Sequence, residues 1–211
     1  MTMKNKTSLF SRNYDFSTKL LCIFFLIIYN NCCMGQDSIK KITLGGGCFW
    51  CIEAVFEDVN GVESVVSGFS GGEIKNPAYR EVVNGKTNHA EVCQISYNPG
   101  IINLEDILEI FFFSHDPTTI NRQGNDIGRH YRSIILYHYD YELNLINKEI
   151  EKYNNEYFNN LIVTEIKKYK EFYPAEEYHQ EYYKNNKNQP YCKIVIEPKI
   201  QKARELLNRF Y

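Results

Sequence analysis

Short apolar and polar segments follow one another along the chain with two different periods. A two-residue alternation or a β-branched run is typical of strands and occurs in residues 41–44, 62–69, 91–97, 131–139, 163–169 and 192–196. Helical periodicity or composition occurs in residues 48–56, 104–112, 141–154, 174–183 and 200–210. The pattern shows no strict strand–helix–strand repeat. It therefore predicts a single α+β domain with a mixed sheet and flanking helices.

Residues 1–35 have the pattern of a leader peptide rather than of a folded element. Four basic residues precede the unbroken apolar run Leu20–Tyr29. This run is too short to span a bilayer as a helix, but it has the length of the apolar part of a signal peptide. Removal of the leader leaves residues 36–211 as an exported domain. A lipid anchor on Cys32 or Cys33 is an alternative, although two Asn residues precede them where small residues are usual.

The composition is that of a folded domain. The chain has 211 residues, of which 44% are apolar and 24% charged, and these values exclude a disordered or fibrous protein. The leader contains four of the 24 Lys and Arg residues and one of the 26 Asp and Glu residues, so residues 36–211 carry a net charge of −5. We expect no nucleic-acid partner. We expect a monomer in a periplasmic or other extracytoplasmic compartment, with membrane contact only through the leader.

Seven cysteines are an odd number for a disulfide scaffold and unusual for an ordinary cytosolic enzyme. Three of them lie in the leader. The other four are Cys48, Cys51, Cys93 and Cys192. Cys93 lies inside a strand pattern and is expected to be a buried apolar residue.

The segment Gly45–Cys51 is the most informative stretch of the sequence. Its three glycines permit a sharp turn and leave space beside the next residue. Cys48 then lies at a helix N-terminus, where free N–H groups and the helix dipole favour the thiolate. Cys51 is within one helical turn, so its sulfur can reach that of Cys48. Such a pair is typical of sulfenic acid formation followed by disulfide formation.

Aromatic and acidic residues in four other places have the chemistry of a polar site. Phe49 and Trp50 lie between the two cysteines and can line an apolar pocket, or pack in the core. Tyr79 follows a Pro-Ala turn, and Glu91 starts a strand, where partial burial raises the pKa of a carboxyl. The last two are Asp126 and Tyr131, which flank a junction between a loop and a strand. Tyrosine and protonated glutamate both donate hydrogen bonds to an oxygen atom.

These segments resemble peptide methionine sulfoxide reductases of the A type. The resemblance begins with Gly45–Trp50 followed by Glu53. It continues through residues 62–72, 76–81, 89–91, 115–119, 122–126 and 189–192. One such motif would be weak evidence, but several in one order over about residues 41–197 are specific. The fold that the resemblance implies is a compact α+β domain with a ferredoxin-like core.

The resemblance also implies the roles of four catalytic residues. Cys48 looks like the nucleophile that attacks the sulfoxide sulfur, and Glu91 like the acid that protonates the sulfoxide oxygen. Tyr79 and Tyr131 look like the hydroxyls that hold this oxygen. The chemistry agrees, because sulfoxide oxygen is a poor leaving group unless it is protonated, and a buried carboxyl can titrate near the working pH.

Substrate and reductant are likewise implied by the resemblance. Phe49 and Trp50 look like the wall around the S-methyl group, and Asp126 like a polar anchor for the substrate backbone. The family reduces the S epimer of methionine sulfoxide, free or protein-bound, and so repairs oxidised proteins. It needs no bound cofactor or metal, and thioredoxin or another dithiol recycles it.

Two cysteines are candidates for resolving the sulfenic acid. Many relatives have Gly at the position of Cys51 and resolve through cysteines near the C-terminus. We favour Cys51 because it is close to Cys48 in sequence. Cys192 follows a polar stretch that can deliver it, although its alternation with Ile194 and Ile196 predicts a packed strand. A relay from Cys51 to Cys192 is also open.

Three places depart from the usual pattern of the family. Phe69 stands where Tyr is more common, which should matter little. Asn88 replaces a Gly, but Asn tolerates the left-handed backbone region that such a turn needs. Arg129 and His130 precede Tyr131 where smaller or amide residues are common, so they add charge beside the predicted site and can alter substrate preference.

Two other functions are weighed against this one. The CxxC pair alone also occurs in thioredoxin-like disulfide oxidoreductases, but the residues between the leader and Cys48 leave room for only one strand. A zinc-binding module would use Cys48, Cys51, Cys192 and a histidine, and a single CxxC without a second paired motif is a weak zinc signal.

Overall fold

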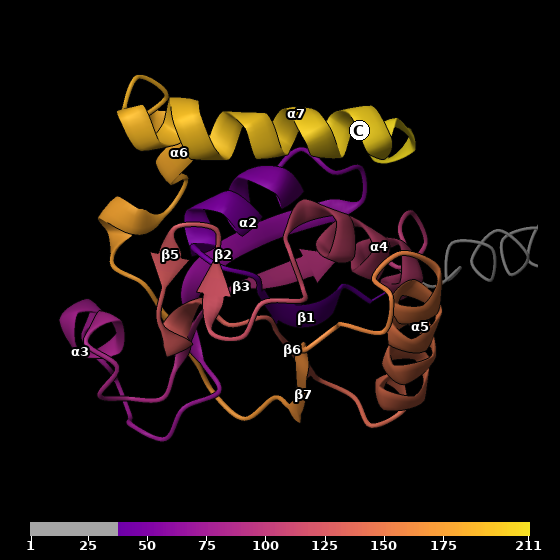
Figure 1. Ribbon diagram of the computed structural model, residues 1–211, viewed down its shortest axis with the longest axis horizontal. Coiled ribbons are helices and arrows are strands. Elements are labelled where there is room, and N and C mark those ends of the chain that lie inside the picture. Colours follow the sequence, from indigo (N-terminus) through magenta and orange to yellow (C-terminus); the bar gives the residue numbers. More distant parts are fainter. Residues whose placement is uncertain (1–37) are drawn as a thin grey trace, which may run out of the picture. The chain divides into compact units, whose positions relative to one another are not determined.

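Six strands form a mixed sheet in the computed structural model, which describes residues 38–211 (Figure 1). Their order is β7 (Glu165–Lys168), β6 (Ile134–Tyr137), β1 (Lys40–Gly45), β3 (Ala90–Tyr97), β2 (Val62–Ser70) and β8 (Phe172–Pro174). Neighbouring strands are antiparallel, except β6 and β7, which are parallel. The predicted α+β class with a mixed sheet is confirmed. The predicted leader, residues 1–35, lies outside the described residues.

The sheet is strongly curled. β7 and β8 form its opposite edges, yet only residues 169–171 connect them along the chain. Four residue steps span at most about 14 Å, whereas the outer strands of a flat six-stranded sheet lie about 24 Å apart. The two edges must therefore approach each other at this connection.

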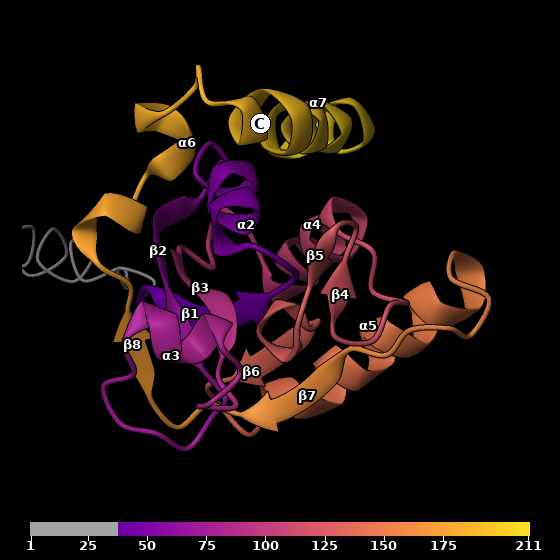
Figure 2. The ribbon, with the colours of Figure 1, turned by 60° about the vertical axis from the view of Figure 1, so that its left-hand side comes forward.

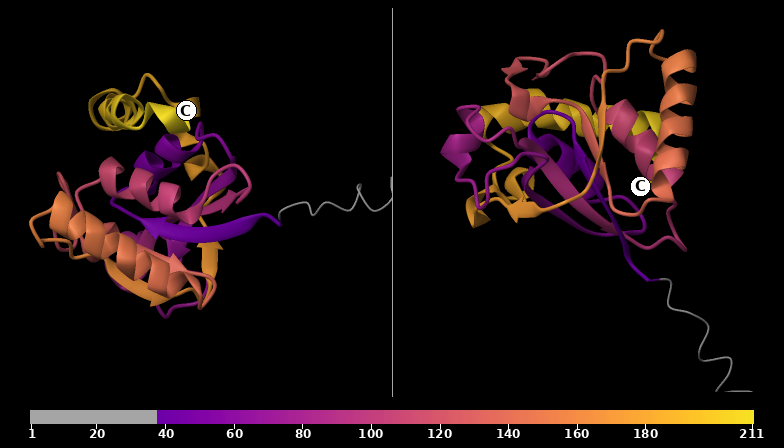
Figure 3. Two further views of the ribbon diagram at one scale, coloured as in Figure 1. Left: turned by 90° about the vertical axis from the view of Figure 1, so that its right-hand side faces the viewer. Right: turned by 90° about the horizontal axis from the view of Figure 1, so that it is seen from below.

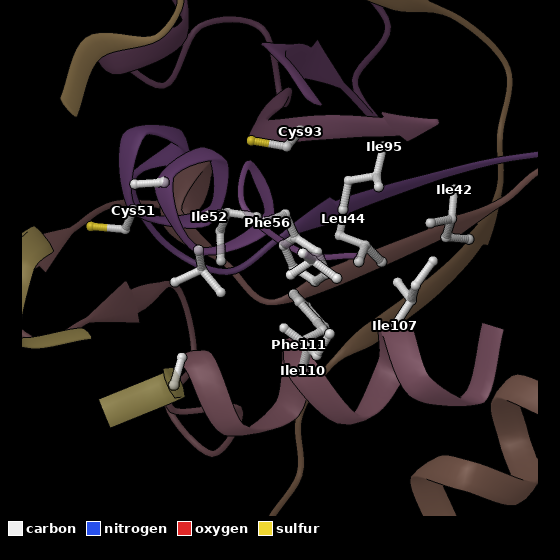
Figure 4. Packing of buried hydrophobic residues seen from close by; sticks show 14 of the residues in the cluster. Ile42, Leu44, Cys51, Ile52, Phe56, Cys93, Ile95, Ile107, Ile110 and Phe111 are labelled. Carbon is white, nitrogen blue, oxygen red and sulfur yellow. The ribbon is translucent and has the colours of Figure 1, made fainter. Parts of the chain in front are cut away.

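Helices cover one face of the sheet and enclose the main core. They are α2 (Phe49–Phe56), α4 (Leu104–Ser114) and α7 (Glu197–Leu206). Figure 4 shows strand residues such as Ile42 and Leu44 packed against Phe56 of α2 and Ile107 of α4. Helix α7 lies across α2 (Figure 1). Helix α5 (Glu142–Glu156) packs against α4 (Figure 3).

The remaining elements are short. They are α3 (Tyr79–Val83), β4 (Arg122–Gln123), β5 (Asp126–Ile127), α6 (Tyr182–Asn185), the 3₁₀ turns Arg129–Tyr131, Glu177–His179 and Asn208–Phe210, and the π-helical turn Cys192–Ile196. Strands β4 and β5 pair as a hairpin. Within residues 38–211, no helix has the length and apolar character needed to cross a membrane.

The prediction of one helix over residues 174–183 is wrong. Pro174 ends β8, and the chain then forms the 3₁₀ turn Glu177–His179 and the short helix α6. Glu181 separates these two turns with a φ of +48°, in the left-handed region. A side chain there is strained, so contacts with the rest of the fold must hold this break in place.

The prediction of a strand over residues 192–196 is also wrong. The segment is a π-helical turn that continues into α7. Cys192 and Ile196 are buried whereas Ile194 is 74% exposed, which is the four-residue spacing of a helix face. The predicted strand at 131–139 is shorter than expected, since Arg129–Tyr131 forms a 3₁₀ turn before β6.

Candidate active site

Glycines place Cys48 at the N-cap position, directly before the helix α2. Gly47 has a φ of +97°, and a Cβ there would lie 2.6 Å from the side chain of Gln123. A Cβ on Gly45 would lie 2.7 Å from the carbonyl oxygen of Glu91. Only glycine fits both the left-handed turn and these close approaches. The turn therefore brings the end of β1, the start of β3 and Cys48 together, as the sequence predicts.

Cys48 and Cys51 form a buried pair of thiols. Cys48 caps the N-terminus of α2 and is 6% exposed, and its carbonyl accepts the N–H of Cys51 at 3.0 Å. Each side chain shifts the pKa of the other, so the two thiols lie close enough to interact. The four cysteines of residues 38–211 are free thiols.

The thiolate character of the pair differs from the sequence-based expectation. The helix N-terminus predicts a lowered pKa for Cys48, but burial raises it well above its usual value, and the Cys51 side chain and the Glu91 charge add to this. The hydrogen bond from the Cys48 thiol lowers the pKa of Cys51 to about 7, and Lys199 of α7 helps. The two pKa values shift in opposite directions, so the thiols ionise as an interacting pair.

Glu91 lies directly beside the nucleophile's helix. The residue follows Ala90 in β3 and is 2% exposed, and its Oε2 accepts the N–H of Phe49 at 3.2 Å. Burial raises the pKa of its carboxyl to about 8. Glu91 therefore carries a proton at neutral pH, which is the property expected of it from the sequence.

Tyr79 and Tyr131 face the same buried group. Tyr79 begins α3, and Tyr131 ends the 3₁₀ turn before β6. Burial, with the charges of Glu91 and Cys48, raises the pKa of Tyr79 to about 12, and the same causes raise that of Tyr131 further. Both phenols stay protonated at physiological pH, so both can donate hydrogen bonds to an oxygen atom placed beside Cys48.

Asp126 is linked to the thiol pair by a tyrosine from the C-terminal part of the chain. Its Oδ2 accepts the hydroxyl of Tyr191 at 2.9 Å. The same hydroxyl lies 3.9 Å from Sγ of Cys51. The Tyr191 hydroxyl therefore lies between the Asp126 carboxylate and the Cys51 sulfur. The sequence motif that contains Tyr191 gave no indication of this link, because its partners lie 65 and 140 positions away.

Phe49 and Trp50 lie in an aromatic cluster. The ring of Trp50 stacks on Tyr182 of α6, with centroids 3.6 Å apart and an angle of 8° between the planes. Phe49 contacts Trp50 at 6.0 Å and the ring of His179 at 5.2 Å between centroids. Tyr182 and His179 could not be identified from the sequence, since they belong to the segment predicted as one continuous helix.

Cys192 and Cys93 occupy different surroundings. Cys192 is buried at the start of the π-helical turn. Burial raises the pKa of the Cys192 thiol, and a negative charge on Cys51 raises it further. Cys93 is buried behind α2, and its thiol donates to the carbonyl of Phe49 at 3.3 Å. The prediction that Cys93 is a packed residue is confirmed.

The zinc alternative finds no support in the site. Over residues 38–211, no three side chains of His, Cys, Asp or Glu converge as a bound metal would require. His115 is engaged with the carbonyl of Phe111 at 2.7 Å and the hydroxyl of Ser133 at 2.8 Å. It is a hydrogen-bonded structural residue.

Comparisons with known proteins agree with the geometry. A family model described as "Peptide methionine sulfoxide reductase" matches residues 40–209. The peptide methionine sulfoxide reductase MsrA of Leptospira borgpetersenii is 54% identical over 164 residues, covering 78% of this chain and 93% of that protein. The reduced form of Mxr1 from Saccharomyces cerevisiae is similar in structure, with a TM-score of 0.69 and 39% identity over 73% of this chain and 89% of that one. Mxr1 in complex with Trx2 matches with a TM-score of 0.51 and 32% identity, over 71% and 90% of the two chains.

Proposed function

We propose that this chain, which belongs to the peptide methionine sulfoxide reductase family and reduces methionine sulfoxide with thiols, uses Cys48 as nucleophile, Glu91 as acid and Cys51 as resolving thiol. The observation that carries the proposal is the position of Glu91. Its protonated carboxyl is fixed on the N–H of Phe49, next to the nucleophile. An acid with a pKa of about 8 still holds its proton at neutral pH and releases it readily to a developing oxyanion.

In the first step the Cys48 proton passes to Cys51, and the Cys48 sulfur attacks the sulfoxide sulfur. Tyr79 and Tyr131 hold the sulfoxide oxygen by hydrogen bonds, and Glu91 gives it a proton. The new S–S bond and the S–O bond of the substrate then both break as the protonated oxygen passes to the Cys48 sulfur, so methionine leaves and Cys48 becomes a sulfenic acid. Cys48 is thereby oxidised by two electrons and the substrate is reduced by two.

In the second step the Cys51 sulfur attacks the sulfenic sulfur of Cys48. A disulfide forms and the hydroxyl leaves as water, for which the proton comes from the Cys51 thiol. Proximity supports Cys51, since it is three residues from Cys48 on the same helical turn and the two thiols shift each other's pKa. A relay that passes the disulfide on to the buried Cys192 is also open.

A dithiol then reduces the disulfide and completes the cycle. We propose a thioredoxin-like protein as this reductant, because the similar protein Mxr1 has been solved in complex with Trx2. The proposed substrate is the S epimer of methionine sulfoxide, both free and within oxidised proteins.

The stereochemical preference tests the function directly. Incubated with dithiothreitol and an excess of each epimer of a methionine sulfoxide derivative, the enzyme should convert the S epimer and leave the R epimer unchanged. Chiral chromatography of the products measures both. Insulin-disulfide reduction is the matched assay for the thioredoxin-like alternative. Activity on insulin without activity on methionine sulfoxide would contradict the proposal.

Single-turnover mapping tests the resolving residue. After one equivalent of sulfoxide without reductant, peptide mapping should find a Cys48–Cys51 disulfide in the wild type and in Cys192→Ser. Cys51→Ser should instead release one methionine, keep a sulfenic acid that dimedone traps, and lose recycling by thioredoxin. If Cys51→Ser still forms a disulfide and recycles with thioredoxin, Cys192 is the direct partner of Cys48.

We also propose that the chain is exported, from the basic segment and apolar run of residues 1–35. Cell fractionation with mass determination of the mature N-terminus should find a protein that begins near Gln36. A lipid-modified Cys32 or Cys33 at the N-terminus would indicate an anchored protein, and an intact N-terminal segment in the cytoplasm would contradict export.

A further inference from the structure

Glu53 is a buried carboxyl that the proposed chemistry does not use. The residue lies in α2, two positions after Cys51, and is 1% exposed. Its Oε2 accepts the N–H of Tyr182 at 3.2 Å. Its Oε1 is buried without a hydrogen-bond partner in the described part of the chain. Burying a carboxyl with an unpartnered oxygen costs stability. We therefore expect the contact that this carboxyl makes to have a role.

The hydrogen bond of the Glu53 carboxyl goes to residues 175–192, a segment that we call the strap. Figure 2 shows the strap passing beside β2 and α2 and then leading into α7. Near its start, Gln180 is fixed to β2, because its side chain accepts the N–H of Ser67 at 3.0 Å and donates to the carbonyl of Ser67 at 2.9 Å. The next residue, Glu181, has the left-handed backbone described above. The N–H of the residue after this turn, Tyr182, donates to the carboxyl of Glu53.

Besides His179, which contacts Phe49, the strap contributes three side chains to the site. Tyr182 stacks on Trp50. Tyr191 donates to Asp126 and lies beside Cys51, and Cys192 is buried next to Cys51. Trp50 and Glu53 are three positions apart on α2 and so are neighbours on the helix surface. The helix therefore holds Tyr182 twice, through its ring and through its backbone N–H.

We propose that Glu53 is a positioning residue that fixes the backbone of the strap at Glu181 and Tyr182, and so keeps the Tyr182 ring on Trp50. This inference rests on the proposed function only in giving Trp50 a place in the wall around the substrate's methyl group. Without the carboxyl, the N–H of Tyr182 loses its acceptor directly after the strained turn at Glu181. The turn then relaxes, and the face of Trp50 becomes accessible to solvent.

Trp50 provides the readout, because it is the only tryptophan in the chain. Glu53→Met keeps a similar volume but removes the acceptor, and replacing a buried charge by an apolar group is often compatible with folding. In this variant acrylamide should quench the Trp50 fluorescence about twice as strongly as in the wild type, with a KM about tenfold higher and a kcat within about threefold. Glu53→Gln retains a carbonyl acceptor and should restore both values to within about threefold.

Glu142 in α5 offers a matched control. Like Glu53, it is 1% exposed. Its Oε2 accepts the N–H groups of His138 at 2.9 Å and Tyr139 at 3.1 Å. Its Oε1 is buried without a hydrogen-bond partner among the described residues. Glu142→Met should leave the quenching of Trp50 and the KM unchanged. Tyr182→Leu should reproduce the signature of Glu53→Met with Glu53 intact.

The outcomes separate the inference from the proposed function, since quenching needs no turnover. If Glu53→Met shows the quenching and KM of the wild type, the inference is overturned while the proposed function stands. An equal change in Glu142→Met also overturns it, because the effect would then be a general loosening. A wild-type enzyme without sulfoxide reductase activity would instead contradict the proposed function. Should Glu53→Met not fold, Tyr182→Leu decides: wild-type quenching and KM there would overturn the inference.

Discussion

Replacing Cys48 with Ser abolishes methionine sulfoxide reduction, with an expected fall in kcat/KM of about 10⁴-fold or more, the scale seen when a covalent nucleophile is removed. A serine hydroxyl is not deprotonated near neutral pH, and no residue beside it has a basicity that compensates. The Cys51 thiol cannot substitute, because it lies one helical turn further along α2. The measurement is the single-turnover yield of methionine together with the loss of free thiols.

The control for this variant is another buried cysteine. Cys93→Ala removes a thiol of similar burial that contacts α2 only from behind, so its activity should stay within about threefold of the wild type. A Cys48→Ser enzyme that retains one hundredth of the wild-type activity would show that another group forms the bond to oxygen or sulfur.

Replacing Glu91 with Gln should slow methionine formation about 10²- to 10⁴-fold, the range for removal of a general acid. The glutamine keeps the hydrogen bond with the N–H of Phe49 but has no proton to transfer. In the wild type the proton-bearing form is active and its pKa is about 8. The rate should therefore fall as the pH rises through about 8, and this alkaline limb should be missing in the variant.

The acidic side of the same pH profile reports the ionisation of the Cys48–Cys51 thiol pair. The pKa of Cys51 is about 7, so the pair loses its first proton there and kcat/KM should rise towards that pH. The expected profile is a narrow bell between about 7 and about 8, measured by methionine release over pH 5 to 10 with Glu142→Gln as the control. An alkaline limb that persists in Glu91→Gln would assign the acid to another residue.

The local sequence pattern predicts those elements whose structure is determined by neighbouring residues. The three glycines before Cys48 predict the turn at the start of α2, and the buried face of α4 follows from the spacing of Leu104, Ile107 and Phe111. Asn88 adopts the left-handed conformation expected of it, with a φ of +57°. These elements depend on residues less than about ten positions apart.

The C-terminal part was mispredicted because tertiary contacts decide its structure. Cys192, Ile194 and Ile196 alternate like a strand, but the segment packs against α2 as a helical turn and exposes Ile194. The break at Glu181 depends on Glu53, 128 positions earlier. The same limit applies to electrostatics, since the helix terminus predicts an acidic Cys48 thiol, whereas burial by the assembled fold raises its pKa.

The sequence identifies the residues of the candidate site in two ways, through local thiol chemistry and through the resemblance to the family. Cys48 and Cys51 follow from thiol chemistry and spacing alone. Tyr79, Tyr131 and Asp126 were identified through the resemblance, because no local pattern distinguishes them from other surface residues. Tyr191, Tyr182 and Glu53 received no role from either source, since their importance lies in contacts between α2, the β4–β5 hairpin and the strap.

The edge strands of the curled sheet are poorly suited to pairing with another chain. A reductase of oxidised proteins meets unfolded segments, and an open sheet edge would pair with them as a template for aggregation. Here the two edge strands have only four and three residues. β7 carries charges at Glu165, Lys167 and Lys168, and β8 ends in Pro174, which has no N–H to offer. We expect the enzyme to engage oxidised chains through single methionine side chains, without adding their backbone to its own sheet.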